Sequence, residues 1–128
     1  MIPMCLDQGV GLIPWSPLAR GKLARPVGES SNRNETDPTS RLLYAATEEA
    51  DNRVITAVEK IATDRGVPMA QIGLAWVLNK QGVSAPIVGA SKVSQLDDAI
   101  AALQIKLTAD EIAALEKQYV PHAVTGHN

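Results

Sequence analysis

The stretch that decides the fold is Gly11-Leu12-Ile13-Pro14-Trp15-Ser16-Pro17-Leu18-Ala19-Arg20-Gly21-Lys22. Residues 10–16 are almost continuously apolar, a pattern typical of a strand buried on both faces and therefore of a parallel sheet. A second stretch begins with another predicted strand, over residues 85–90, and reads Pro86-Ile87-Val88-Gly89-Ala90-Ser91-Lys92-Val93-Ser94-Gln95-Leu96-Asp97-Asp98. Both strands pass directly into loops rich in hydroxyl, glycine and basic groups. Parallel α/β proteins use such loops to present backbone N–H groups and cations to a phosphate.

The segment between the two strands has the periodicity of two helices. The first covers residues 48–65 and is ended by Gly66. Pro68 suits the first turn of the second helix, which Gly82 ends. The inward face of the first helix is predicted to carry Val54, Val58, Ile61 and Ala62. Two helices between two strands form a crossover, which is the connection that parallel strands require.

Two more helices are expected after the second strand. Ser94 is a candidate cap for the first of them, which we expect to turn Leu96, Ile100 and Leu103 inward. The run Thr108-Ala109-Asp110-Glu111 is a capping box and opens the last helix.

Strand ends of this kind fit the last two units of a (β/α)₈ TIM barrel, where a phosphate site is often built. The 128 residues are about half of a typical barrel. We therefore expect an α/β fold that is the C-terminal part of such a barrel, its last two strands with their helices. Residues 2–8 read as the tail of a helix ended by Gly9, so we expect a truncated piece of a longer protein. The chain is predicted to be a single partial barrel domain over residues 1–128, with a variable loop at 24–47 and an irregular tail at 119–128.

Composition narrows the function classes. The chain is 45% hydrophobic but only 3% aromatic, with no Phe, so its core must be built from Val, Ile, Leu and Ala. A net charge of −2 argues against a nucleic-acid or anionic-membrane surface. The single cysteine, Cys5, excludes an intramolecular disulfide and a cysteine-based zinc site, and we read it as a buried thiol rather than a nucleophile. No metal site is expected. Because no membrane span or secretory signal is recognisable, we expect a cytoplasmic protein.

Each loop can be read in two ways. At the second strand, a phosphate would receive backbone donors from the helix start, the Ser91 hydroxyl and the Lys92 cation, but an ordinary strand-to-helix turn accounts for the same residues. At the first strand, Trp15 could stack on a planar ring while Arg20 and Lys22 meet an anion. The alternative is a core tryptophan with two surface charges.

Together, the two loops resemble the C-terminal part of an aldo-keto reductase, in the bacterial branch similar to potassium-channel β-subunits. The segment Ile-Pro-Trp-Ser-Pro-Leu-Ala-Arg-Gly-Lys-Leu resembles the family's segment after strand seven, and Ala-Gln-Ile-Gly-Leu-Ala-Trp-Val-Leu resembles its following helix. The second quoted stretch resembles strand eight and the nucleotide-binding helix. The resemblance covers essentially the whole chain.

What the resemblance implies is a nicotinamide cofactor and its binding residues. Trp15 would stack on the nicotinamide ring, and Ser91 with Lys92 would hold an adenosine 2′-phosphate, which implies NADPH rather than NADH. The pyrophosphate would be lined by Ser16, Leu18, Gly21 and Lys22. The adenosine end would be contacted by Gln95 and Asp98. Asp98-Ala99 departs from the Glu-Asn that is frequent in the family, which puts one adenine contact in doubt.

The resemblance also exposes a gap. Catalysis in the family uses an Asp, a Tyr proton donor, a Lys and a His, and no residue of this chain matches those positions. Tyr44, Tyr119, His122 and His127 are not substitutes, because they fall in the variable loop and the tail. We therefore expect the cofactor-binding part of an NADPH-dependent reductase, with a small carbonyl substrate in the full-length parent and no activity of this chain alone. The alternatives are a non-catalytic NADPH-binding or interaction module and a phosphate-binding barrel piece that acts on sugar phosphates. We also expect the isolated chain to be poorly stable or to self-associate through its exposed strand edges.

Overall fold

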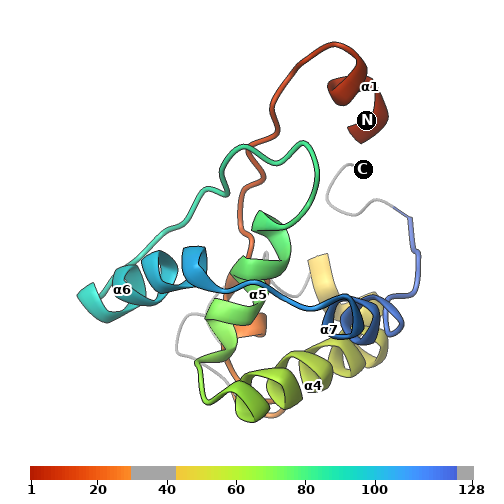
Figure 1. The fold of residues 1–128 in the computed structure, drawn as a ribbon. Coiled ribbons are helices and arrows are strands. Elements are labelled where there is room, and N and C mark those ends of the chain that lie inside the picture. Colours follow the sequence, from red (N-terminus) through yellow and green to blue (C-terminus); the bar gives the residue numbers. More distant parts are fainter. Residues whose placement is uncertain (30–42, 124–128) are drawn as a thin grey trace.

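A computed structural model describes residues 1–29 and 43–123, which are mainly helical (Figure 1). The α-helices are α1 (Ile2–Asp7), α4 (Glu48–Arg65), α5 (Met69–Leu78), α6 (Val93–Ala101) and α7 (Ala109–Glu116). Three short 3₁₀ helices join them: η1 (Ala19–Ala24), η2 (Ala45–Thr47) and η3 (Ala102–Gln104). The core lies where α5 packs between α4, η1, η3 and α6, with α7 laid across α4. None of the helices in these ranges is long and apolar enough to cross a membrane.

The helix predicted over residues 48–65 is confirmed as α4. Acidic side chains occupy its first turn, where they favour the positive end of the helix dipole. Gly66 ends it in the left-handed conformation, with φ +66°. Of the predicted inward residues, Val58, Ile61 and Ala62 are buried, whereas Val54 is only half-buried and its neighbour Ile55 takes the core position.

Helix α5 is the centre of the core and is shorter than predicted. Ile72 and Leu74 are 0% and 2% exposed. Pro68 precedes the helix as its N-cap, and the helix ends at Leu78 instead of continuing to Gly82. Asn79 explains the early end, because its side-chain amide donates to the Ala75 carbonyl (2.7 Å), the same carbonyl that its backbone N–H uses.

The two predicted strands are wrong in extent, although their direction is confirmed. In the described ranges the segments meet only at two isolated parallel bridges, Leu12 with Val83 and Trp15 with Ile87. Pro14 lacks an N–H group, so the hydrogen-bond ladder is interrupted between the bridges. The expected burial on both faces is also absent, since Trp15 is 67% exposed and Ile87 53%. These segments do not by themselves close any part of a barrel.

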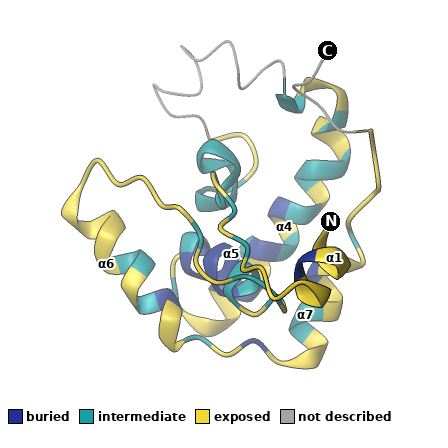
Figure 2. Cartoon of the chain, turned by 90° about the horizontal axis from the view of Figure 1, so that it is seen from above, coloured by how far each residue is buried: buried dark blue, intermediate teal, exposed yellow. Residues whose placement is uncertain are grey.

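Helix α6 departs from expectation at both its start and its apolar face. Its N-cap is Lys92, so Ser94 lies inside the helix. The residues predicted to point inward are more than half exposed: Leu96, Ile100 and Leu103. Helix α6 contains no buried residue, its main contacts are with α5 and η3, and its apolar side chains stay largely exposed (Figure 2). The buried apolar residue next to α6 in the chain is Ala102 of η3, which is 1% exposed.

Polar contacts fasten α7 at both ends. The predicted capping box is present: the Thr108 hydroxyl accepts from the Glu111 N–H, and the Glu111 carboxylate accepts from the Thr108 N–H. Glu111 also forms a two-pronged ion pair with Arg65 of α4. At the other end, Glu116 accepts from the Trp76 indole N–H and pairs with Lys80 of the loop after α5.

The predicted loop and the predicted tail are described only in part. In the predicted loop 24–47, residues 25–29 are irregular as expected, whereas Ala45–Thr47 form the helix η2; residues 30–42 lie outside the described residues. In the predicted tail, residues 119–123 are irregular, and residues 124–128 lie outside the described residues. Cys5 is buried, as expected of a structural thiol, and Gly9 ends α1 with φ +66°.

Candidate functional site

The loop that follows Trp15 is held in an unusual backbone conformation. Ser16, Ala19 and Arg20 have φ values of 52°, 49° and 56°, and Gly21 has a φ of 94°. Residues other than glycine rarely adopt such φ values, because each costs of order 1–3 kcal/mol. Residues strained in this way cluster at functional sites. In this loop the Arg20 N–H donates to the Ser16 hydroxyl oxygen at 3.3 Å, so the backbone of the strained residues is held by bonds within the loop.

Local packing and hydrogen bonds hold this loop against the core. The Ala19 N–H donates to the Ser16 carbonyl (2.9 Å), and the Gly21 N–H to the Leu18 carbonyl (2.9 Å). Leu18 anchors the loop on α5 at Gly73, where an added Cβ would come within 3.2 Å of the leucine Cδ2. Glycine at this helix position therefore permits the close approach of the loop.

Basic side chains of the loop are oriented by specific partners. The Arg25 guanidinium donates to the Gly21 carbonyl (3.3 Å). The Lys22 ammonium lies over the ring of Tyr44, 5.2 Å from its centroid. Burial raises the pKa of the Tyr44 phenol, and the nearby charge of Arg20 opposes that rise.

The second predicted loop stands at the exposed start of α6. Ser91 and Lys92 are both exposed, and their backbone N–H groups donate to the side-chain oxygen of Gln95 at 2.8 and 3.2 Å. The Ser91 hydroxyl shares the same acceptor at 3.2 Å. Of the donors predicted to receive a phosphate, the two backbone N–H groups and the Ser91 hydroxyl are thus directed at the Gln95 amide oxygen.

Asp98 is fixed from the core. The side-chain amide of Gln71 in α5 donates to its carboxylate at 2.8 Å. Gln71 is 8% exposed and is the one buried polar side chain of the described residues. Sequence reasoning missed this link, although a polar residue among the apolar positions of the helix was a signal for it.

The structure brings the predicted residues into two groups whose strand ends are adjacent. Because Trp15 and Ile87 form a parallel bridge, the loops that follow them leave the same edge of the pair. The first group is the strained loop with Trp15, Ser16, Leu18, Gly21 and Lys22. The second is the start of α6 with Ser91, Lys92, Gln95 and Asp98. Tyr44 was not predicted to belong to either group.

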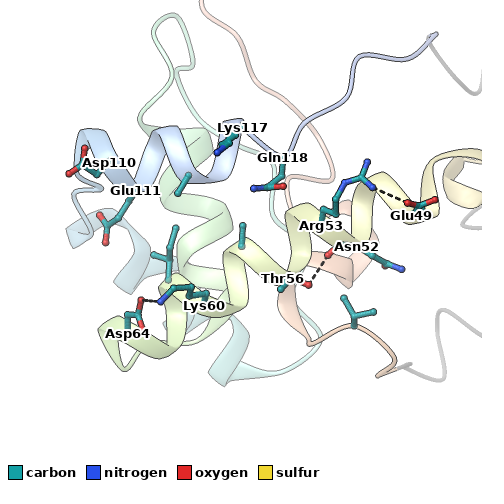
Figure 3. A pocket seen from close by; sticks show the side chains of 14 residues that line it. Glu49, Asn52, Arg53, Thr56, Lys60, Asp64, Asp110, Glu111, Lys117 and Gln118 are labelled. Carbon is teal, nitrogen blue, oxygen red and sulfur yellow. Dashed lines mark hydrogen bonds and ion pairs between the residues drawn. The ribbon is translucent and has the colours of Figure 1, made fainter.

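A groove that the sequence did not predict runs between α4 and α7 (Figure 3). Its volume is about 960 Å³, and two ion pairs within α4 line it: Arg53 with Glu49 and Lys60 with Asp64. These charges satisfy each other along one helix. Nor does any group of three His, Cys, Asp or Glu side chains in the described ranges come together to hold a metal ion. The two loops are therefore the stronger candidate site.

Comparison with known proteins assigns the chain to a family. Residues 1–119 match the Aldo/keto reductase family. The chain is 48% identical over 126 residues to versiconal hemiacetal acetate reductase from Aspergillus parasiticus, covering 97% of this chain and 36% of that protein. It is 44% identical over 122 residues to a putative aryl-alcohol dehydrogenase of Saccharomyces cerevisiae, covering 94% and 35%. An aldo-keto reductase of Fusarium vanettenii is 42% identical over 129 residues, covering 100% and 34%.

The chain thus spans about a third of the length of the curated relatives it matches. These relatives are fungal, and the match reaches the level of the family rather than that of a particular branch. With the family model covering residues 1–119, this chain belongs to the aldo/keto reductase family of oxidoreductases.

Proposed function

We propose that this chain is the C-terminal cofactor-binding part of an NADPH-dependent aldo-keto reductase that transfers hydride between a nicotinamide and an aldehyde or ketone. The observation that carries the proposal is the strained loop, with its left-handed residues at 16 and 19–21, placed directly after the exposed Trp15. The family fold is a (β/α)₈ barrel, and the parallel bridges fit two neighbouring strands of it. The resemblance to the branch of potassium-channel β-subunits stays a prediction, as does a cytoplasmic location.

The donor set of the first loop suits a dinucleotide. The exposed indole of Trp15 offers a flat face to the nicotinamide ring. The Ser16 hydroxyl and the Lys22 ammonium would donate to a pyrophosphate, and Leu18 and Gly21, whose backbone is held by the Gly21 N–H bond to the Leu18 carbonyl, would line it. The loop is already held in one conformation by its own hydrogen bonds, so less ordering remains to be done when the nucleotide arrives.

The second loop suits the adenosine end. Ser91 and Lys92 would hold a 2′-phosphate at the N-terminus of α6, with Gln95 and Asp98 near the adenosine. The cofactor supplies the hydride when bound, and the protein's part is to bind and orient it. Because no residue of this chain matches the family's Asp, Tyr, Lys and His positions, we propose that the chain alone is inactive and that the parent acts on a small carbonyl compound.

A non-catalytic module is the second candidate, favoured by the open apolar face of α6 and by the exposed bridge residues. Trp15, Ile87 and Leu96 are each more than half exposed, and neighbouring segments normally cover such positions. We propose that these edges cause self-association. Sizing chromatography combined with a melting curve tests this: oligomers or a loosely packed monomer are expected, and a sharply melting monomer at low concentration would contradict it.

Nucleotide binding is the direct test of the proposed function. NADPH fluorescence titration should show saturable binding to the unsubstituted chain. Lys92→Ala should weaken NADPH about tenfold or more and leave NADH nearly unchanged, because a charge-assisted hydrogen bond is worth roughly 1.5–3 kcal/mol. Lys117→Ala is the matched control, since that lysine is exposed at the C-cap of α7. An equal loss of both nucleotides in the Lys92 variant would count against the 2′-phosphate assignment.

A further inference from the structure

Tyr44 links the strained loop to the start of α4, although no role was predicted for it. Its ring is half-buried, and the Lys22 ammonium lies 5.2 Å from the ring centroid. The charge of Arg20 acts on the same phenol. Two cations of the loop therefore interact with one tyrosine, which lies more than twenty residues further along the chain.

Each partner in this arrangement is constrained from its own side. Tyr44 precedes η2, and the Thr47 hydroxyl donates to Asp51 of α4 at 2.8 Å, with the Tyr44 carbonyl at 3.5 Å as a second, weaker acceptor. Lys22 lies in η1, which packs against α5 and α4. The ring is thus anchored on the helical core, and the lysine on the loop.

We propose that Tyr44 is a positioning residue for Lys22, holding its ammonium beside the loop so that the cation is already oriented for the pyrophosphate of the nucleotide. This inference rests on the proposed function, because the nucleotide is the anion that the lysine would meet. A free lysine side chain would lose rotamer freedom on binding, and the ring removes part of that loss in advance. The contact uses the face of the ring, so the phenol hydroxyl is dispensable for it.

The first measurement concerns the contact itself and requires no nucleotide. Lysines carrying ¹³C-methyl groups are observed by NMR, and Lys22→Arg identifies the Lys22 signal by its disappearance. The aromatic ring should displace this signal upfield in the unsubstituted chain and in Tyr44→Phe. In Tyr44→Leu the displacement should vanish. Tyr119→Leu, which removes the other tyrosine of the chain, should leave it unchanged.

The second measurement is NADPH affinity by fluorescence titration. Tyr44→Leu should weaken binding about three- to tenfold, because the lysine then loses more of its rotamer freedom when the nucleotide binds. Tyr44→Phe should stay within about twofold of the unsubstituted chain. In a Lys22→Met background, Tyr44→Leu should cause no further loss, because the two side chains act as one unit.

The outcomes separate the two proposals. If the unsubstituted chain fails to bind NADPH, the proposed function is overturned and this inference with it. If NADPH binds and Tyr44→Leu weakens it no more than Tyr119→Leu does, the inference alone is overturned. The same holds if the loss in Tyr44→Leu persists in the Lys22→Met background. Should Tyr44→Leu not fold, a fivefold or greater loss of affinity in Tyr44→Phe would also overturn it, since the hydroxyl would then be essential.

Discussion

Replacing Glu111 by Gln should remove the two-pronged ion pair between α4 and α7 and keep the cap of α7. The glutamine can still accept from the Thr108 N–H, because the capping box accommodates either residue. What is lost is the charge, together with one of the two oxygens that accept from Arg65, whose Nε and Nη2 lie 2.5 and 2.6 Å from the carboxylate oxygens. The variant therefore isolates the contribution of this ion pair to the free energy of unfolding.

The size of the effect follows from the pKa of Glu111. The hydrogen bond from Arg65 is the largest of the influences that lower this pKa from 4.5 to about 2. A fall of roughly 2.5 pH units corresponds to about 3.4 kcal/mol. The two side chains are 29% and 22% exposed, so solvent screens part of this energy and we expect about 1–2 kcal/mol.

The direction of the pH dependence is also fixed. A carboxylate whose pKa is lower in the folded chain stabilises it above the unfolded pKa and loses that stabilisation as the pH falls. The difference in the free energy of unfolding between the unsubstituted chain and Glu111→Gln should therefore have its full size above about pH 4.5 and disappear toward pH 2.

Urea unfolding followed by circular dichroism at a series of pH values measures this difference. Glu49→Gln is the matched control, since Glu49 is 94% exposed and pairs with Arg53 on its own helix, where a pair contributes only a few tenths of a kcal/mol. Equal stabilities of the Glu111 variant and the unsubstituted chain at pH 7 would refute the reasoning, as would a difference that persists unchanged at pH 2.

Three further outcomes are expected. Thr108→Ala should lower the free energy of unfolding by about 1 kcal/mol, because it removes the acceptor of the Glu111 N–H, and urea unfolding checks this against Thr63→Ala at an exposed helical site. Gln71→Met should weaken NADPH by several-fold at unchanged helix content, since it releases the carboxylate of Asp98; unaltered affinity would argue against that link. The isolated chain should show no aldehyde-dependent oxidation of NADPH in an absorbance assay, because a missing proton donor alone typically costs about 10²–10⁴-fold; steady turnover would disprove this.

The helical half of the fold was readable from the sequence because its signals are local. Gly66 and the Thr108 capping box mark helix ends through contacts within four residues, and both are present in the structure. The strand segments depend on partners elsewhere in the chain. Trp15 and Ile87 have the apolar character of buried strand residues, yet each finds one neighbouring segment here and remains exposed. The same reasoning applies to the apolar face of α6.

The candidate site was predictable where its residues are contiguous. The loop after Trp15 and the start of α6 were found from their composition. By contrast, the contact between Lys22 and Tyr44 joins residues separated by a loop of irregular sequence, and periodicity gives no information across such a gap. Sequence reasoning also missed that the Gln95 side chain accepts from the Ser91 and Lys92 N–H groups, because it considered this glutamine only as a contact for the nucleotide, which stays a prediction.

A helix without a buried side chain has consequences for the order in which the molecule opens. Helix α6 is retained by the Gln71–Asp98 hydrogen bond and by Ala102, so its amide protons should exchange with solvent at a free energy far below that of α5. Opening of α6 would carry Ser91 and Lys92 away while the loop at Trp15 stays on the core. A nucleotide that spans both loops would then act as a latch: its binding would slow hydrogen exchange in α6 first, and its release would begin at the adenosine end.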